Sequence, residues 1–246
     1  MTASQIQSLL VINNSNYVFE QWQGTLLIIA ISFFSIIFNT YLARSLPLIE
    51  GIVLFFHLAG FLAILIPLWI LAPKNTAKAV FTEFTDGGNW GNTGLSCIIG
   101  MLSPIFTLIG PDSATHMSEE IKDASWVLPR AMMWTVFING VLGYIMLITF
   151  CFCLGDVNSI LSNPDVMPFV QVFLNATNSL AGTSIMTTIV IILTTCGCIT
   201  NVATASRQLF AFARDDGLPF SKFLAHVSST PPLCTTLLRA FTYEKI

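Results

Sequence analysis

The segment from Leu108 to Glu120, LIGPDSATHMSEE, places a helix-breaking Gly110-Pro111 pair and Asp112 at the end of an apolar stretch. Proline has no backbone N–H and clashes with the preceding helical turn, so a helix through these residues loses hydrogen bonds. Inside a bilayer no water replaces those bonds, and other polar groups must do so. Two interpretations stand side by side: a substrate-binding gap between two half-helices, or a proline kink in which Asp112 is the N-cap of the second arm.

The two predicted half-helices offer opposite partial charges to a ligand. The first arm, residues 94–109, ends in unpaired carbonyls and a partial negative charge, which suits an ammonium group or a cation. The second arm, about residues 113–124, begins with free amides and a partial positive charge, which suits a carboxylate. A zwitterion matches both ends of the break.

Three ionisable residues are candidates for proton coupling. Asp112 and His116 are four residues apart, so they share one face of a helix and are placed to share a proton. His57 lies within a long apolar segment, where an ionisable side chain is functional by default. The alternative is a neutral His57 that is hydrogen-bonded to a backbone carbonyl.

Glu119, Glu120 and Arg130 follow the break and are candidates for an ion-paired cytoplasmic gate, with plain solvated charge as the equal alternative. The spacing of His116 and Glu119 does not predict a metalloprotease, because a second histidine is absent. The six cysteines include two C-x-C pairs within apolar spans and lack zinc-site spacing, so we expect them to pack as small apolar residues. We therefore predict no enzyme, no metal and no cofactor.

The composition bounds the setting in which these residues act. Of 246 residues, 54% are hydrophobic and 9% are charged, and the mean hydropathy is +0.76. Soluble domains carry about 25% charged residues, so this is predicted to be an integral membrane protein whose surroundings are lipid. The net charge of -3, without a basic run or stripe, excludes nucleic acid as a partner.

The apolar stretches predict membrane-spanning helices, because each reaches the roughly 20 residues that cross a bilayer and none has the alternation of a barrel strand. Five spans are predicted, at about 24–43, 48–72, 94–116 (broken), 132–154 and 182–205. The basic residues gather in one set of connections, which is predicted to be cytoplasmic. Residues 1–23, 73–93 and 155–181 are then outer loops, and no signal peptide is recognised in the first of them.

Other polar residues have common structural explanations. The threonines of the last span are interpreted as hydrogen-bonding within their own helix or to a neighbouring helix, rather than as the lining of a polar path. The sequons at Asn13 and Asn175 both fall on the outer side. Asn175 is interpreted as an ordinary polar loop residue, because sequons are frequent by chance.

Three segments together resemble a known family. They are GPDSATHMSEEIKDASWVLPRAM at residues 110–132, SR and ARDDGLP within residues 206–219, and SLP, His57 and GF within residues 45–61. This combination resembles the amino acid, polyamine and organocation transporter superfamily, and within it the fungal amino acid and choline transporter branch that includes GABA permeases. The resemblance covers residues 15–230.

The resemblance implies a fold and a domain arrangement. The spans would match helices four to eight of a twelve-helix transporter with two inverted repeats, and the broken span would be helix six. The implied fold class is an all-α integral membrane protein, a partial inverted-repeat bundle with a discontinuous helix. Residues 1–230 would be a partial permease domain, and residues 231–246 a divergent C-terminal tail of a truncated product.

The resemblance also implies a function and a site. The function is transport of amino acids or related amines such as GABA or choline-like compounds, by proton-coupled uptake into a fungal cell. The plasma membrane is the expected location, with vacuole and endoplasmic reticulum as alternatives. A non-transporting sensor or remnant that acts through partners is the alternative function. The implied substrate-binding residues are Phe106, Thr107, Leu108, Ile109, Gly110 and Asp112.

Overall fold

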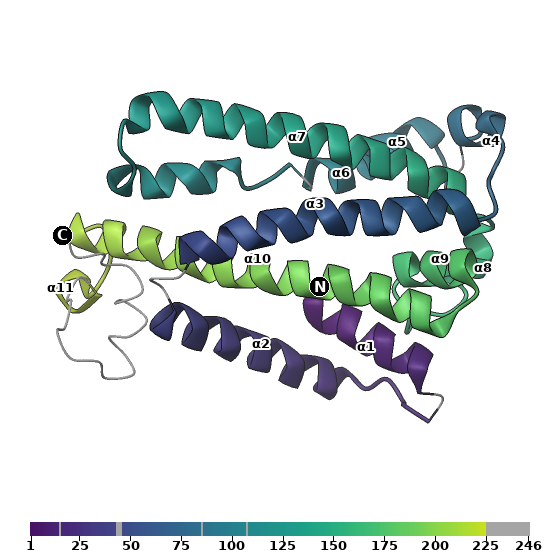
Figure 1. Ribbon diagram of the computed structural model, residues 1–246, viewed down its shortest axis with the longest axis horizontal. Helices are drawn as coiled ribbons and strands as arrows, with labels where there is room; N and C mark the ends of the chain where they lie inside the picture. Colours follow the sequence, from purple (N-terminus) through teal and green to yellow (C-terminus); the bar gives the residue numbers. More distant parts are fainter. Residues whose placement is uncertain (15, 43–45, 85, 107, 225–246) are drawn as a thin grey trace. The chain divides into compact units, whose positions relative to one another are not determined.

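The described chain is all-α, as the sequence predicts. A computed structural model describes residues 1–14, 16–42, 46–84, 86–106 and 108–224, shown in colour in Figure 1. All regular elements over these ranges are helices. The predicted tail, residues 231–246, lies outside the described residues.

Among the residues that the structure describes, four helices are long and apolar enough to cross a membrane, by length and composition. They are α2 (Gln21–Tyr41), α3 (Leu46–Leu71), α7 (Ala124–Cys153) and α10 (Leu180–Arg214). The predicted span at 94–116 is not among them, because it is divided into shorter pieces.

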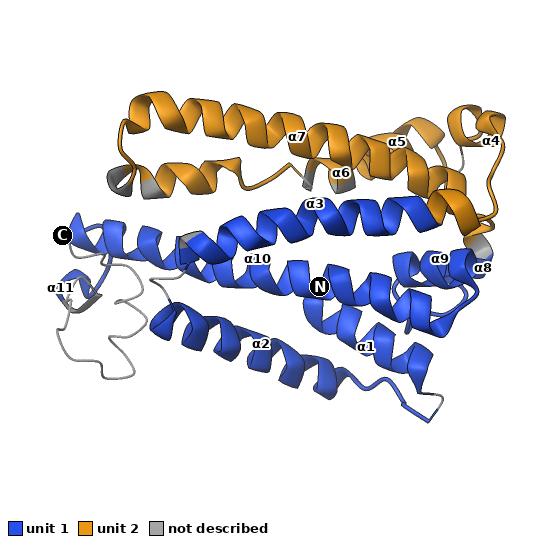
Figure 2. Cartoon of the chain, in the orientation of Figure 1, with its two compact units in different colours: residues 1–67, 158–246 blue, residues 68–157 orange. Residues whose placement is uncertain are grey.

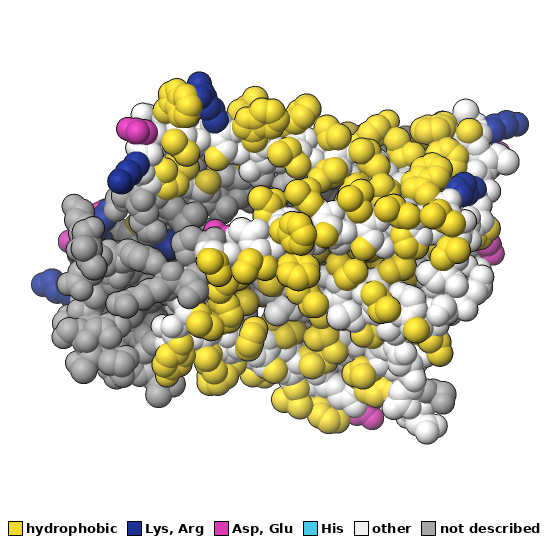
Figure 3. All heavy atoms as spheres, in the orientation of Figure 1, with side chains coloured by type: hydrophobic (Ala, Val, Ile, Leu, Met, Phe, Trp, Pro, Cys, Tyr) yellow, Lys and Arg dark blue, Asp and Glu magenta, His cyan; other side chains and the backbone are white. Residues whose placement is uncertain are grey.

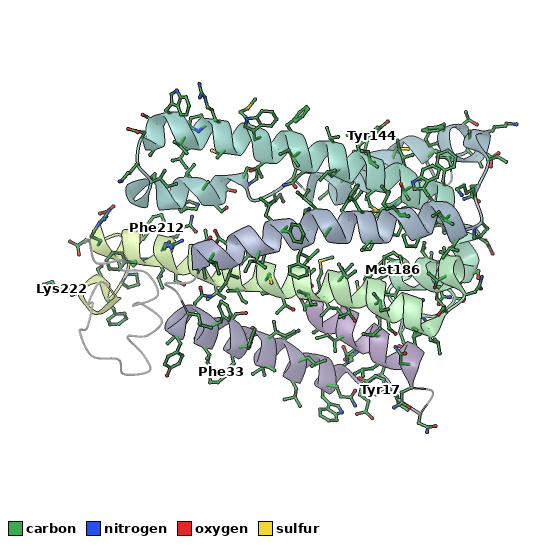
Figure 4. All side chains as sticks on the ribbon, in the orientation of Figure 1. Tyr17, Phe33, Tyr144, Met186, Phe212 and Lys222 are labelled. Carbon is green, nitrogen blue, oxygen red and sulfur yellow. The ribbon has the colours of Figure 1, made fainter. Side chains whose placement is uncertain are left out.

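The surfaces of these helices are suited to lipid. Hydrophobic side chains cover their visible faces, and most charged side chains in view lie near helix ends (Figure 3). Phe33 on α2 and Tyr144 on α7 project from their helices (Figure 4) and are largely exposed. In water such apolar exposure would be costly, so the exposed faces belong in a bilayer or against other helices.

The chain divides into two compact units, coloured separately in Figure 2. The first comprises residues 1–67 and 158–246, and the second comprises residues 68–157.

Helix α10 is the centre of the first unit. Four helices pack against it: α1 (Thr2–Asn13), α2, α9 (Pro168–Thr177) and α11 (Ser221–Leu224). Leu46, Ile199 and Ala203 are buried together, with Phe38 beside them. The buried amide of Asn39 on α2 donates to the carbonyl of Ile199 on α10 at 2.9 Å. A polar group in an apolar interior is tolerated because it is paired in this way.

The N-terminal segment is helical, so the expectation of a loop over residues 1–23 is wrong for its first half. Helix α1 spans Thr2–Asn13 and packs on α10 and α2. Its buried face is polar: Thr194 on α10 donates to the side-chain oxygen of Gln5 at 2.8 Å, and Ser8 accepts from the Met167 amide at 2.9 Å. An apolar-periodicity argument misses a helix whose buried side is held by hydrogen bonds.

Several threonine hydroxyls of α10 bond within their own helix, as expected from the sequence. Thr188, Thr195 and Thr200 each bond to the carbonyl four residues earlier. These contacts satisfy the three hydroxyls without a polar path, whereas the buried hydroxyl of Thr187 has no hydrogen-bond partner among the described residues.

The segment after α7 also departs from a loop. It contains α8 (Val157–Leu161) and α9 (Pro168–Thr177). Asn175 lies within α9, where its side chain accepts from Gln171 at 2.9 Å, so its interpretation as a loop residue is wrong. Pro168 at the first position of α9 is compatible with a helix start, because that N–H has no helical partner.

The second unit consists of α7 and four short elements: α4 (Ala77–Thr82), α5 (Thr93–Gly100), α6 (Leu102–Phe106) and η2 (Pro111–Glu120). Helix α7 begins at Ala124, eight residues before the predicted start of that span at 132, and continues through Pro129. Pro129 is the sixth residue of α7, so it removes one intrahelical hydrogen bond without ending the helix. The other end of α7 is tied down by Thr149, which accepts from the Trp69 indole at 2.9 Å.

Candidate functional site

The predicted break is present at Gly110. Helices α5 and α6 lead toward it, and η2, a 3-10 helix, leaves from Pro111. Gly110 has φ 112° and ψ -6°, a left-handed conformation that residues with a Cβ avoid. Pro111 then starts η2 at a position where its missing N–H costs nothing.

The backbone between α6 and η2 is only partly hydrogen-bonded. The Leu108 amide donates to the Ile105 carbonyl, and the Ser113 amide donates to the Gly110 carbonyl, each at 3.0 Å. Within the described part of the chain, Ile109 has no hydrogen-bond partner for its N–H or its C=O. Unpaired backbone at membrane depth is tolerated where it lines a cavity.

A cavity of about 200 Å³ lies at this backbone, within the second unit. One wall is the break itself, residues 108–111, and the other is a face of α7 that presents Thr135, Val136 and Asn139. No ionised side chain is among these lining residues. The polar groups of the lining residues are therefore backbone amides and carbonyls, one hydroxyl and one carboxamide.

The predicted binding residues are placed unevenly around this cavity. Leu108, Ile109 and Gly110 line it. Phe106 is the last residue of α6, and its side chain, like the whole of Thr107, lies outside the described part of the structure. Asp112 is not a lining residue.

Asp112 does not have the capping role that was one reading of the sequence. The N-cap of η2 is Gly110, and no side chain caps this helix. Asp112 lies in the first turn instead, where a carboxylate still interacts favourably with the partial positive end of the helix. The structure ends η2 at Glu120, so the second arm is shorter than the predicted 113–124.

Asp112 and His116 approach each other as their spacing predicts. The Nε2 of His116 lies 3.9 Å from Oδ2 of Asp112. The Asp112 side chain is 71% exposed and that of His116 is 26% exposed, so water reaches the pair in the isolated chain. His57, the third coupling candidate, is an exposed residue of α3 in the first unit.

Arg130 stacks on an aromatic ring. Its guanidinium carbon lies 3.3 Å from the ring centroid of Trp126, one turn earlier on α7. This is a cation–π contact, which suits the weakly hydrated guanidinium. Glu119 and Glu120 are the last residues of η2, and their side chains lie outside the described part, so the predicted gate remains a prediction.

Sequence reasoning missed the second wall of the cavity. Asn139 and Thr135 are four residues apart, so they lie on one face of α7. The available signal was an asparagine in the middle of an apolar span, a position at which polar side chains are rare and often functional.

Comparisons with a family profile and with individual proteins point to the same family. The profile of the amino acid permease family matches residues 1–234. The chain is 32% identical over 217 residues to a protein of Macrophomina phaseolina that is named as an amino acid/polyamine transporter, covering 87% of this chain and 47% of that protein. It is 28% identical over 229 residues to a choline transporter of Saccharomyces cerevisiae, covering 92% and 40%.

A third relative is amino-acid permease 2 of Neurospora crassa, 27% identical over 173 residues, which covers 68% of this chain and 30% of that protein. No solved structure matches the chain. The chain spans less than half of the length of these relatives. Because the family profile covers nearly all of the chain and the apolar helices agree with it, this multi-pass membrane protein belongs to the amino acid permease family.

Proposed function

We propose that this chain takes part in moving an amino acid or a related amine across a membrane, and that the cavity at the helix break is its share of the substrate site. The observation that carries the proposal is the unpaired backbone around Gly110, facing a cavity inside an apolar helical unit. Discontinuous helices in transporters bind substrate in this manner, with half-helix ends directed at its charged groups. The names of the relatives support an amine-containing substrate.

The residues before the break have defined parts in this proposal. Leu108, Ile109 and Gly110 would contact the substrate through their backbone, and Phe106 and Thr107 would complete the same segment. Asp112 would not contact the substrate from the cavity wall. It would act from the first turn of η2, where its carboxylate interacts with the partial positive end of that helix. Backbone contacts bind the features that amine substrates share, so they do not select among side chains.

Proton coupling is the second part of the proposal. The Asp112–His116 pair offers a carboxylate and an imidazole that interact when the imidazole is protonated. His57 is a further candidate because it lies within an apolar span. Uptake that is driven by an inward proton gradient in the parent and loses that dependence in Asp112→Asn or His57→Gln would identify the carrier.

Gating is the third part. Glu119, Glu120 and Arg130 follow the break on the predicted cytoplasmic side and would close the inner end of the pathway by ion pairing. The stacking of Arg130 on Trp126 describes one arrangement of the guanidinium, from which it would turn to a carboxylate. The plasma membrane is the expected location for an uptake system of this kind.

The substrate-site proposal is tested by binding to the purified chain in lipid nanodiscs. Labelled 4-aminobutanoate, leucine and choline are titrated against the parent, Gly110→Ala and the control Gly51→Ala. A Cβ at either glycine meets no atom within 4 Å, but only Gly110 has a positive φ, so Gly110→Ala changes the backbone of the break alone.

An alanine in this conformation costs about 1–3 kcal/mol. We expect Gly110→Ala to weaken binding by roughly 5- to 150-fold and Gly51→Ala to leave it unchanged. Equal affinities for the two variants, or no saturable binding of any probe by the parent, would refute the site. Saturable binding without uptake in sealed vesicles would favour the sensor role over transport.

A further inference from the structure

Asn139 is a polar residue of the second cavity wall, and the packing of α7 gives its side chain no hydrogen-bond partner among the described residues. It lies near the middle of α7 (Ala124–Cys153), in an apolar helix long enough to cross a membrane. That position places its carboxamide near the centre of a bilayer, where a polar side chain without a partner is costly. Asn139 therefore needs a hydrogen-bonding partner.

Asn39 on α2 and Thr149 on α7 are polar residues of the long helices that have such partners. The Asn39 amide donates to two carbonyls, those of Ser35 and Ile199, at 2.8 and 2.9 Å. Thr149 accepts from the Trp69 indole and donates to the Ile145 carbonyl. Over the described ranges, the exposed side chains of Asn139 and Thr135 have no hydrogen-bond partner, although a threonine hydroxyl in a helix readily bonds to the preceding turn.

The cavity in front of these two side chains shows what the partner would need. Three hydrogen-bond acceptors belong to residues that line it: the Asn139 carboxamide oxygen, the Thr135 hydroxyl and the unpaired Ile109 carbonyl of the facing wall. No aromatic ring is present among its described lining residues. A primary ammonium group donates three hydrogen bonds to such acceptors, whereas a quaternary ammonium group donates none and is held by aromatic faces.

We propose that Asn139, assisted by Thr135, is a specificity-determining residue that binds the ammonium group of a primary amine and so disfavours quaternary amines at this cavity. The inference rests on the proposed substrate site and adds to it the residue that selects the amine class. The relatives include both a choline transporter and an amino-acid permease. The proposed role of Asn139 distinguishes these two substrate classes.

The test uses two pairs of probes that differ only in methylation of the nitrogen. Ethanolamine is compared with choline, and 4-aminobutanoate with 4-(trimethylammonio)butanoate, by equilibrium binding to the purified chain in nanodiscs. Hydrogen bonds to charged groups contribute about 1.5–3 kcal/mol. The parent is therefore expected to bind the primary member of each pair at least about tenfold more tightly.

Three variants show whether Asn139 causes this preference. Asn139→Leu keeps the size and removes the acceptor, so the affinity ratio is expected to fall toward one through weaker binding of the primary amine. Asn139→Asp keeps an acceptor oxygen and is expected to retain the preference, which a purely structural role would not predict. Val141→Ala, on the same helix but outside the cavity lining, is the control and should keep the parental ratio.

The possible results are distinguishable. Equal or tighter binding of the quaternary members by the parent would overturn the inference and leave amine binding at the cavity intact. The same would follow from an unchanged ratio in Asn139→Leu, or from loss of the preference in Asn139→Asp with the protein folded. Failure of the parent to bind any of the four probes would overturn the proposed site, and the inference with it.

Discussion

Gly60 of α3 lies against Ile189 of α10, and replacing Gly60 tests how the first unit is packed. A Cβ at Gly60 would lie 2.7 Å from Cγ2 of Ile189, well inside van der Waals contact. Ile189 cannot easily move that methyl, because a β-branched side chain in a helix has one strongly preferred rotamer. Gly60→Ala must therefore push the two helices apart.

Two opposing effects set the magnitude. Overpacking of this kind costs about 1–3 kcal/mol, while replacing a helical glycine by alanine gains roughly 0.5–1 kcal/mol. Gly51→Ala, on the same helix with nothing within 4 Å of its Cβ, carries the second effect alone. The difference between the two variants isolates the contact, and we expect Gly60→Ala to be less stable than Gly51→Ala by about 1–3 kcal/mol.

Unfolding in mixed micelles by a denaturing detergent, followed by circular dichroism, measures the free energy of each variant. Ile189→Leu removes the branching methyl at nearly constant volume, so adding it to Gly60→Ala should recover most of the lost stability. The coupling arises because the two residues touch. Equal stability of Gly60→Ala and Gly51→Ala, or no recovery in the double variant, would show that this approach of α3 to α10 is incorrect.

Three further predictions concern single groups. Asn39→Ala removes the donor to the Ile199 carbonyl and should lower the free energy of unfolding by about 0.6–1.7 kcal/mol, measured in the same micelles; no loss would contradict the α2–α10 contact. The backbone N–H of Trp90 chiefly lowers the pKa of the Asp86 carboxyl below 3.8, so the carboxylate stabilises its loop above that pH and loses the effect as pH falls through the lowered pKa. Trp90 fluorescence should therefore change only below pH 3.8, and a midpoint above it would contradict this. Because Asn175 is hydrogen-bonded within α9, endoglycosidase should leave the electrophoretic mobility of the protein unchanged, and a shift that Asn175→Gln abolishes would oppose this.

The long helices could be predicted from the sequence because hydrophobicity alone determines where they lie. The long apolar helices follow from runs of residues that only lipid or other helices can accommodate. Their ends were harder to predict: α7 begins at Ala124, whereas the sequence predicted a start at about residue 132. The helix continues through Pro129, and Arg130 stacks on Trp126 within it.

Helix α1 shows the opposite limitation. Its inward residues Gln5 and Ser8 are polar, and their hydrogen-bond partners lie more than 150 residues away in the sequence. No local pattern contains those partners. Only packing on α10 makes a buried polar face favourable, so the sequence read this segment as a loop.

The sequence by itself determined that the chain is an all-α membrane protein and that its helix breaks at Gly110, because hydropathy, proline and glycine act over one or two turns. It also singled out Leu108, Ile109 and Gly110. Only the tertiary structure decided that Asn139 and Thr135 of α7 face that break and that Asp112 stands outside the cavity. A cavity exists only between elements that have already packed, and the direction of a side chain across it depends on the register of two helices, which no single segment encodes.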